Sequence, residues 1–357
     1  MGDILGLGLT HYPMLAGKDQ HMSSLLRMTL KDPDIPQSEK DPQNWPAAMR
    51  AEWSDDKGRA AAGTHRRQLR DGLAHCRKAL DAFKPDVLVV WGDDQYENFR
   101  EEIVPPFCVL AYPDLEIQPL AELAQFGSAN VWELPTDTTV TLRGAPQIGK
   151  ELAAGLLEGG FDMSYSYRPR EGIHFPHAIA NTQLYLDYDN AGSAFDYPVV
   201  PIAVNCYGSH VVARRGGVVS FARIAAGEQL DPPAPSPRRC FELGRAVAAT
   251  LRQSSHRVAL IASSSWSHAF LNDKDWHLHP DTASDRAYYE ALVAGDIDRW
   301  LQATTDDLVA AGQQEMLNWF CLLGAMTELN QPLTWSSFVE TGIFNSNKCF
   351  AVYEVAA

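Results

Sequence analysis

The sequence predicts a single α/β domain, residues 1–357, around a central mixed or parallel sheet with helices on both faces. Strand-like runs of β-branched and aromatic residues alternate with longer segments whose apolar residues recur at helical spacing. The strand-like runs are nearly continuous in apolar residues, which is typical of strands covered on both faces. With 357 residues, 45% of them hydrophobic, the chain can bury a large core, and no linker-like stretch divides it.

The elements follow one another in an order that supports this fold. The expected strands are residues 3–9, 86–91, 107–112, 197–205, 257–263 and 349–355, and the expected helices are residues 60–83, 148–157, 238–252, 284–303 and 312–329. Residues 18–58 contain four prolines and many charges, which predicts a loop-rich insertion that serves as a lid or an interface. Residues 216–237 are predicted to form a second loop-rich segment that interrupts the pattern of strands and helices. The pair Gly6 and Gly8 does not open a dinucleotide loop, because His11 stands where the third glycine would be.

Composition limits the partners and the compartment. Asp and Glu outnumber Lys and Arg by 45 to 30, so the chain repels phosphate backbones and anionic membranes, and neither nucleic acid nor membrane is expected as a partner. The chain shows no signal-peptide pattern and no apolar run near the roughly 20 residues of a membrane span, which predicts a cytoplasmic protein. The six cysteines lack any Cys-x-x-Cys pair, so we expect reduced thiols in the core.

Polar residues follow several of the expected strands at the point where each strand ends. They are His11, the segment 93–96 (Asp-Asp-Gln-Tyr), Asn205 and the segment 265–268 (Ser-Trp-Ser-His). In open α/β sheets, ligands bind in the crevice beyond the carboxyl ends of the strands. Any one of these segments can be an ordinary capped turn. Together, they predict a functional site at one edge of the sheet.

Six motifs lie in the same order as in a known enzyme family. They are residues 8–13 (Gly-Leu-Thr-His-Tyr-Pro), 89–95 (Val-Val-Trp-Gly-Asp-Asp-Gln), 200–205 with 239–244, 265–268, 315–319 (Glu-Met-Leu-Asn-Trp) and 344–347 (Phe-Asn-Ser-Asn). In this order they resemble the class III extradiol ring-cleavage dioxygenases, the family of the protocatechuate 4,5-dioxygenase β subunit and the gallate-type dioxygenases. The resemblance spans nearly the whole chain, with residues 18–58 as the main additional part.

The resemblance implies a non-haem Fe(II) dioxygenase, with Mn(II) as a second possible metal, that uses O2 to cleave a catechol-like or gallate-like ring. It also implies a homo-oligomer. His11 and Glu315 would be metal ligands, because two neutral imidazoles and one carboxylate leave positions open for the catechol and for dioxygen. His268 would relay protons, a task that suits a side chain with a near-neutral pKa.

His177 would be a pocket histidine that contacts substrate or oxygen, with His174 as the weaker alternative. Each assignment has a simpler explanation. Glu315 lies near a helix start, where the helix dipole alone favours a carboxylate. His268 can be a surface-loop histidine, and a histidine pair three residues apart can lie at an ordinary helix start.

The chain departs from the family at its second metal-binding histidine. The family places that histidine at, or one residue beyond, the position of Gln95, where this chain has Gln95 and Tyr96. Gln95 or Tyr96 can itself replace it, although an amide oxygen is a weak ligand for Fe(II) and a tyrosine favours the ferric state. Otherwise water or another residue completes the site. His65, near the start of the helix 60–83, is one candidate, although it can equally lie in an exposed cationic first turn. Asp93 and Asp94 are others, and they would favour harder metals such as Mn(II) or Mg(II).

Two alternative functions follow from this departure. The chain can be a divergent metal-dependent enzyme on the same fold that does not cleave rings, such as a hydrolase or another oxygenase. It can also be a non-catalytic homologue that has lost the metal, because a shared fold does not establish activity. Metal content and oxygen uptake with catechols distinguish these alternatives from ring cleavage.

Overall fold

A mixed sheet lies at the centre of the computed structural model, which describes residues 2–121, 123, 129–171 and 175–355. The described residues form eight strands in the order β6-β3-β7-β2-β8-β1-β10-β9, with β7, β2, β8 and β1 parallel to one another. β3 and β10 run antiparallel to their inner neighbours, so the sheet is mixed. The strands are β1 Ile4–Leu9, β2 Val87–Asp93, β3 Phe107–Leu110, β6 Ser164–Ser166, β7 Val199–Val204, β8 Val258–Ser263, β9 Trp335–Val339 and β10 Lys348–Tyr353; a separate pair comprises β4 Leu115–Ile117 and β5 Val140–Leu142.

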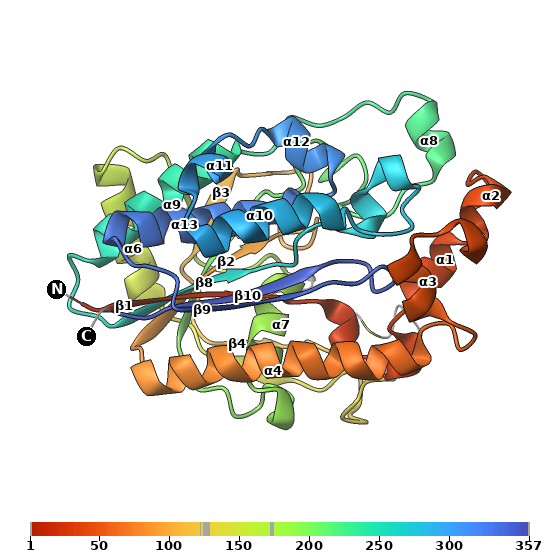
Figure 1. Ribbon diagram of the computed structural model, residues 1–357. Coiled ribbons are helices and arrows are strands. Elements are labelled where there is room, and N and C mark those ends of the chain that lie inside the picture. Colours follow the sequence, from red (N-terminus) through yellow and green to blue (C-terminus); the bar gives the residue numbers. More distant parts are fainter. Residues whose placement is uncertain (1, 122, 124–128, 172–174, 356–357) are drawn as a thin grey trace.

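Helices cover both faces of this sheet, which confirms the predicted fold class (Figure 1). On one face lie α4 Arg59–Phe83 and α7 His177–Leu186; on the other lie α6 Pro146–Glu158, α9 Pro237–Leu251, α10 Thr282–Ala294 and α13 Leu317–Leu329. The shorter helices are α1 Ser24–Thr29, α2 Gln37–Lys40, α3 Ala47–Trp53, α8 Phe221–Ala225, α11 Ile297–Leu301 and α12 Thr305–Ala310. β1 runs from the end of the molecule where both termini lie towards the end where α1, α2 and α3 lie (Figure 1).

The side chains of the central strands divide between two cores. In β2, Val89 and Trp91 belong to the core that α9 and α13 cover, whereas Leu88 and Val90 belong to the core that α4 and α7 cover. Successive residues of a strand point to opposite faces, so a strand buried on both faces must be apolar at every position. This requirement explains the continuous apolar runs of the sequence.

Gly6 and Gly8 allow α13 to approach β1 closely. A Cβ atom on Gly6 would lie 2.4 Å from the sulfur of Met326, and one on Gly8 would lie 2.2 Å from the ring of Trp319. Both distances are shorter than any van der Waals contact, so larger residues would push the helix away. Close packing, and not phosphate binding, accounts for this glycine pair.

Several elements differ from their prediction. The expected helix 284–303 is divided into α10 and α11, because Gly295 adopts a left-handed φ of 68° between them. The expected helix 312–329 starts later, since residues Gln314–Met316 form a 3-10 turn before α13. Residues 18–58 are less loop-like than expected, because they contain α1, α2 and α3. β6 and β9 were not predicted, since both are short and contain serines (SYS and WSSFV).

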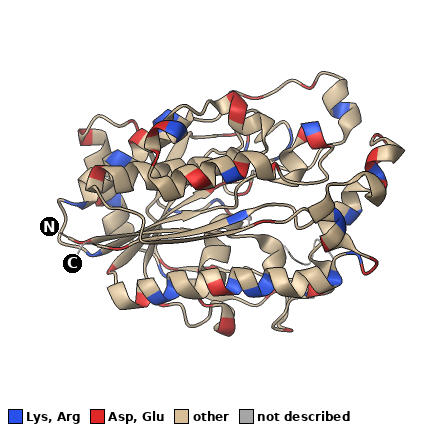
Figure 2. Ribbon diagram, viewed as in Figure 1, with Lys and Arg blue, Asp and Glu red and all other residues tan. Residues whose placement is uncertain are grey.

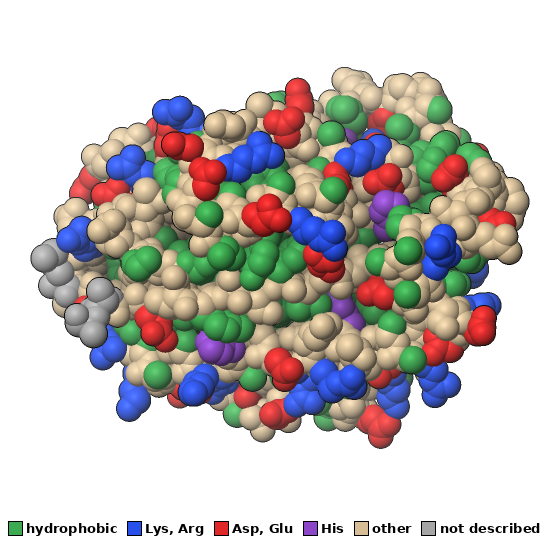
Figure 3. Space-filling model, in the orientation of Figure 1, with side chains coloured by type: hydrophobic (Ala, Val, Ile, Leu, Met, Phe, Trp, Pro, Cys, Tyr) green, Lys and Arg blue, Asp and Glu red, His purple; other side chains and the backbone are tan. Residues whose placement is uncertain are grey.

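The surface carries mixed charge. Lys and Arg alternate with Asp and Glu along the outer faces of α4 and α10 (Figure 2). Between these helices, on the face shown in Figure 3, hydrophobic side chains gather near the sheet edge formed by β9. All six cysteines are buried with free thiols, as predicted. In the described ranges, no helix combines the length and hydrophobicity that crossing a bilayer requires.

Candidate metal centre

His11 is fixed at the end of β1 by a backbone bond to the neighbouring strand. Its Nδ1 donates to the carbonyl oxygen of Ser263 at 2.9 Å. The other ring nitrogen, Nε2, then faces Asp93 Oδ1 at 3.7 Å and Glu315 Oε2 at 3.5 Å. Burial lowers the pKa of His11 well below its ordinary value, so the imidazole is neutral. A neutral imidazole whose other nitrogen is held by a hydrogen bond is the form that binds metals.

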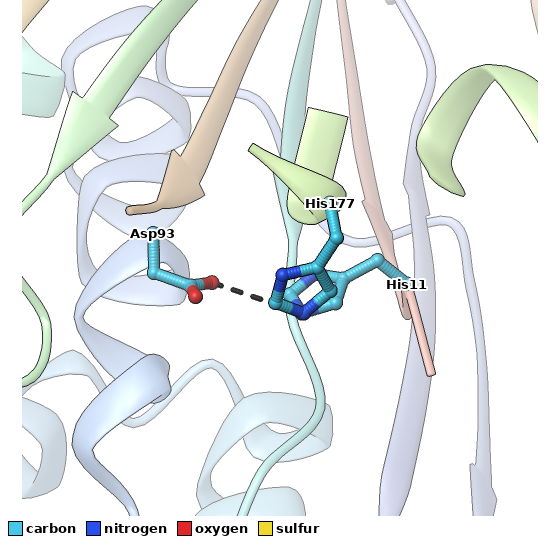
Figure 4. Close-up of side chains that lie close together, drawn as sticks. All are labelled: His11, Asp93 and His177. Atoms are coloured by element: carbon cyan, nitrogen blue, oxygen red, sulfur yellow. Dashed lines mark ion pairs between the residues drawn. The ribbon is translucent and has the colours of Figure 1, made fainter. Parts of the chain in front are cut away.

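Asp93 and His177 complete a buried cluster with His11. Asp93 is the last residue of β2, and His177 is the first residue of α7. Their ligand atoms and that of His11 all lie within 4.8 Å of one another, and Figure 4 shows the three side chains converging. Glu97 Oε1 lies 3.0 Å from both Nδ1 and the backbone nitrogen of His177. Because a carboxylate accepts, Nδ1 carries the proton and Nε2 is the acceptor of this ring.

Glu315 enters from the 3-10 turn that precedes α13. Its Oε1 accepts a hydrogen bond of 2.6 Å from the hydroxyl of Tyr207, which orients the carboxylate. Its Oε2 faces His11, as described above. Burial, and then the nearby charge of Asp93, raise the pKa of Glu315 well above its ordinary value. Two carboxylates of like charge in a buried space favour the uptake of a proton or a cation.

The donor set fits a divalent metal ion. Two buried carboxylates, Asp93 and Glu315, face a neutral imidazole, His11, so a cation would relieve their mutual repulsion. Imidazole together with carboxylates suits Fe(II) and Mn(II) in particular. The structure thus offers oxygen from Asp93, or nitrogen from His177, where the family has its second histidine.

His268 lies beside this cluster, in the loop after β8. Its Nε2 is 3.4 Å from Glu315 Oε1, and its backbone nitrogen donates to the carbonyl of Gly312. Its Nδ1 is buried and has no hydrogen-bond partner among the described residues. Burial, with a further effect of the Lys348 charge, lowers the pKa of His268 to about 3. The ring is therefore neutral at pH 7.

His65 is not brought to the cluster, so the structure does not support its expected role as a metal ligand. It is buried on α4, where its ring packs against Phe344, and its Nε2 lies 3.0 Å from the ammonium nitrogen of Lys348. Lys348 also donates to the carbonyls of Phe344 and Ser346 and lies 3.8 Å above the ring of Tyr12. Because this ring nitrogen is hydrogen-bonded to Lys348, it is not available to a metal.

The residues after Asp93 have other roles. Asp94 accepts backbone N–H bonds from Glu97, Asn98 and Phe99, so it caps a turn. The amide nitrogen of Gln95 donates to the carbonyl of Gly216, and the Tyr96 hydroxyl binds Glu101. Of the second motif, Asp93 is therefore the residue that reaches His11. His174 lies outside the described residues.

Asp285, which the sequence did not single out, is hydrogen-bonded to the segments that carry His268 and Glu315 and to the segment before β10. From α10 it accepts hydrogen bonds from the backbone and hydroxyl of Ser267, from Gln313 at 2.6 Å and from Asn347 at 2.8 Å. These partners lie next to His268, two residues before Glu315, and in the segment before β10. No local signal in the sequence distinguishes Asp285 from a surface aspartate in a first helical turn. Tyr207 could have been found, since it follows a predicted strand end.

A cavity of about 220 Å³ opens beside the cluster. Its described lining residues are His11, Tyr12, Pro13, Met14, Leu25, Met28, Gln95, His177, Gly217, Val218, Ser265, His268, Phe270, Glu315 and Asn345. It therefore includes four of the five predicted site residues, namely His11, His177, His268 and Glu315. A larger groove of about 690 Å³, between α4 and the end of α7, contains none of them and is lined by paired Arg and Asp residues.

Comparisons with known proteins agree with the resemblance seen in the motifs. Residues 229–351 match the family described as the catalytic LigB subunit of aromatic ring-opening dioxygenase. This range contains both His268 and Glu315, and the match confirms the resemblance to class III extradiol dioxygenases.

Individual relatives carry dioxygenase names at low identity. A 2,3-dihydroxyphenylpropionate/2,3-dihydroxicinnamic acid 1,2-dioxygenase of Cupriavidus pinatubonensis is 24% identical over 275 residues, which cover 71% of this chain and 80% of that protein. Enzymes of that description from Pseudomonas putida and Paraburkholderia xenovorans are 26% and 28% identical, over 54% and 55% of this chain. With these two proteins the chain aligns over only about half of their length, 46% and 47%.

Proposed function

We propose that this chain is a non-haem metal-dependent dioxygenase that opens the ring of a catechol-like or gallate-like substrate in the extradiol mode. The observation that carries the proposal is that Nε2 of His11 faces carboxylate oxygens of both Asp93 and Glu315, beside a cavity that His11 and Glu315 line. We propose His11, Asp93 and Glu315 as the residues that hold Fe(II), with Mn(II) as the alternative metal. The second carboxylate, in the place of a second histidine, favours the harder Mn(II) as this alternative.

The metal, when bound, supplies positive charge for the two catechol oxygens and a path for electrons from the ring to dioxygen. The protein supplies the proton chemistry. Neutral His268 accepts a proton from a substrate hydroxyl and later returns it, as a positioned histidine base does. Tyr207 holds Glu315 by the 2.6 Å hydrogen bond, so the carboxylate does not rotate away.

His177 is proposed as a second pocket group. Glu97 fixes its ring so that Nε2 accepts hydrogen bonds, which suits a substrate hydroxyl as the donor. Its ring meets that of His11 edge-on, with centroids 4.9 Å apart, so a substrate near the metal lies within its reach. The apolar wall of the cavity excludes water and strengthens these polar contacts.

The experiment is a paired assay of metal and oxygen uptake. Protein purified without oxygen is loaded with Fe(II), its metal content is measured, and oxygen uptake is followed with catechol, protocatechuate and gallate. The proposal predicts about one iron per chain, with oxygen consumed as a yellow ring-opened product forms. Stoichiometric iron with no uptake on any of these substrates would contradict it.

A second candidate is a metal-dependent enzyme on this fold that does not cleave rings, such as a hydrolase or another oxygenase. The replacement of the family histidine by Gln95 and the participation of Asp93 favour it. It predicts bound metal without oxygen uptake. A non-catalytic homologue, in contrast, predicts no bound metal in the wild type and no difference in a His11→Ala variant.

Residues 18–58 are proposed as a cover for the site. Leu25 of α1 and Met28 line the cavity, and Asp34 accepts a bond from the backbone of Ala222 in α8. The two interruptions of the sequence thus contact each other, and both contribute residues to the cavity lining. A single catalytic domain, a homo-oligomeric assembly and a cytoplasmic location complete the proposal, and they rest on the resemblance and the composition.

A further inference from the structure

The cavity beside the metal cluster is lined without a lysine or an arginine. Its described lining consists of apolar, neutral polar and histidine residues, together with Glu315. All 30 lysines and arginines of the chain lie within the described ranges, so none of them is missing from this comparison. A carboxylate on a substrate would therefore meet neither of the side chains that most often bind one.

Lysine and arginine side chains on the neighbouring segments contact other groups of the protein. Arg27, between Leu25 and Met28 in sequence, donates to the carbonyl of Lys57. Arg215, two residues before Gly217, lies over the ring of Tyr96 at 5.6 Å. Lys348 is buried among backbone carbonyls and His65, as described above. None of these side chains is part of the cavity wall.

Much of the exposed surface of the described lining is apolar, including residues at the mouth. Met14, Leu25 and Phe270 line the cavity, and Met28 and Val218 are 54% and 52% exposed at its lining. Glu315 is the one carboxylate among its described lining residues. A carboxylate on the substituent would lose hydration in this space without meeting a cationic side chain, whereas an apolar group would gain by being buried.

We propose that the site prefers catechols with an uncharged, apolar substituent, such as an alkyl or aryl group, over catechols with a carboxylate. This inference rests on the proposed ring-cleaving function. It separates this chain from the relatives above, whose names specify 2,3-dihydroxyphenylpropionate and 2,3-dihydroxicinnamic acid. Met28 and Val218 are proposed as the residues that determine this specificity at the mouth.

The test compares 3-propylcatechol with 2,3-dihydroxyphenylpropionate, which have side chains of similar length and differ in charge. For the iron-loaded wild type, kcat/KM from oxygen uptake is expected to be at least about tenfold higher for 3-propylcatechol. The Kd of each compound for the metal-loaded protein without oxygen, from calorimetry, is expected to differ in the same direction. Equal or tighter binding of the carboxylate compound would overturn the inference.

Variants at the cavity mouth test which residues determine the preference for an uncharged substituent. Val218→Arg and Met28→Lys each add a cation at the mouth and are expected to reduce the ratio between the two compounds by at least about threefold. Val293→Arg is the matched control, because Val293 is 57% exposed on α10 and does not line the cavity. An unchanged ratio in both mouth variants would overturn the assignment of these residues.

The failure of this inference is distinguishable from the failure of the proposed function. Oxygen uptake that favours the carboxylate compound overturns the specificity alone. Absence of uptake with every catechol overturns ring cleavage, and the Kd comparison then still decides whether the cavity prefers the uncharged ring.

Discussion

Asp93 is the residue on which the proposed metal centre most depends. In the resembling family a histidine stands at, or one residue beyond, the position of Gln95, but here Gln95 is held by the carbonyl of Gly216 and Asp94 caps a turn. Asp93 instead ends its strand with a carboxylate that faces His11 at 3.7 Å. The proposed site therefore has two carboxylates and one imidazole, where the family has the reverse ratio.

A comparison of Asp93→Ala with His177→Ala tests this assignment. We expect Asp93→Ala to lower bound iron to less than about one fifth of the wild-type content, since it removes a ligand. We expect His177→Ala to keep its iron and to lose about 100-fold in kcat, since it removes a pocket group. Elemental analysis and oxygen uptake measure both, with exposed Asp189→Asn as the control. Loss of iron in His177→Ala, with full retention in Asp93→Ala, would show that His177 is the metal ligand and that Asp93 is not.

His65→Gln tests whether His65 has a structural role only. The amide can still accept a hydrogen bond from Lys348, so unfolding in urea should show a loss of no more than about 1–2 kcal/mol. Iron content should equal that of the wild type. A folded variant that has lost its iron would restore His65 as a ligand.

At the scale of elements, α10 holds the site together through one side chain. Asp285 joins the loop that carries His268, the turn that carries Glu315 and the segment before β10. These segments are distant in sequence, so their relative positions depend on this carboxylate. Loss of the Asp285 carboxylate would therefore disturb both proton transfer by His268 and metal binding by Glu315.

The Asp285→Asn variant should destabilise the protein in a pH-dependent way. Burial raises the pKa of Asp285 to about 6 from its ordinary value of 3.8. Stability from the protonated folded form is therefore fully present below pH 3.8 and is lost as the pH rises through 6. Because asparagine does not titrate, the destabilisation should be larger near pH 4.5 than near pH 7.5, by about 2 kcal/mol. Urea unfolding of metal-free protein at both values measures it, and a larger loss at the higher pH would contradict it.

The contact between α9 and α13 depends on glycine. A Cβ atom on Gly244 would lie 1.7 Å from the backbone oxygen of Cys321, so Gly244→Ala must push the helices apart. We expect a loss of about 1–3 kcal/mol in the free energy of unfolding. Gly63→Ala is the matched control, because its nearest contact is 3.4 Å away and alanine favours a helix. Equal effects of the two substitutions would show that the close contact does not matter.

The elements differ in how far the sequence predicts them. Strands buried on both faces, such as β1 and β2, have continuous apolar runs and were predicted to within two residues at each end. β9 was not, because a half-exposed edge strand with serines has no clear apolar pattern. The site residues also differ in how far the sequence predicts their roles. His11 can be found from the sequence alone, because it follows a buried strand. The role of Asp93 depends on His11, 82 residues away, and that of Asp285 on partners 18 to 62 residues away, so only the fold reveals them.

At the scale of the whole molecule, metal binding should be linked to folding. The site draws its residues from the ends of β1 and β2, from α7 and from the turn before α13, and unfolding disperses them. A metal ion at 100 times its Kd should therefore stabilise the wild type by about 2.7 kcal/mol. Thermal unfolding with and without a chelator measures this shift. The shift should vanish in His11→Ala, and its persistence there would place the metal elsewhere.

The position of the metal itself is the most direct test. Diffraction data collected at the iron absorption edge, from crystals grown with Fe(II), would locate the ion without reference to activity. We predict one anomalous peak within bonding distance of His11 Nε2 and of carboxylate oxygens from Asp93 and Glu315. A peak bonded to Gln95 or His65, or no peak at this cluster despite saturating iron, would contradict the account.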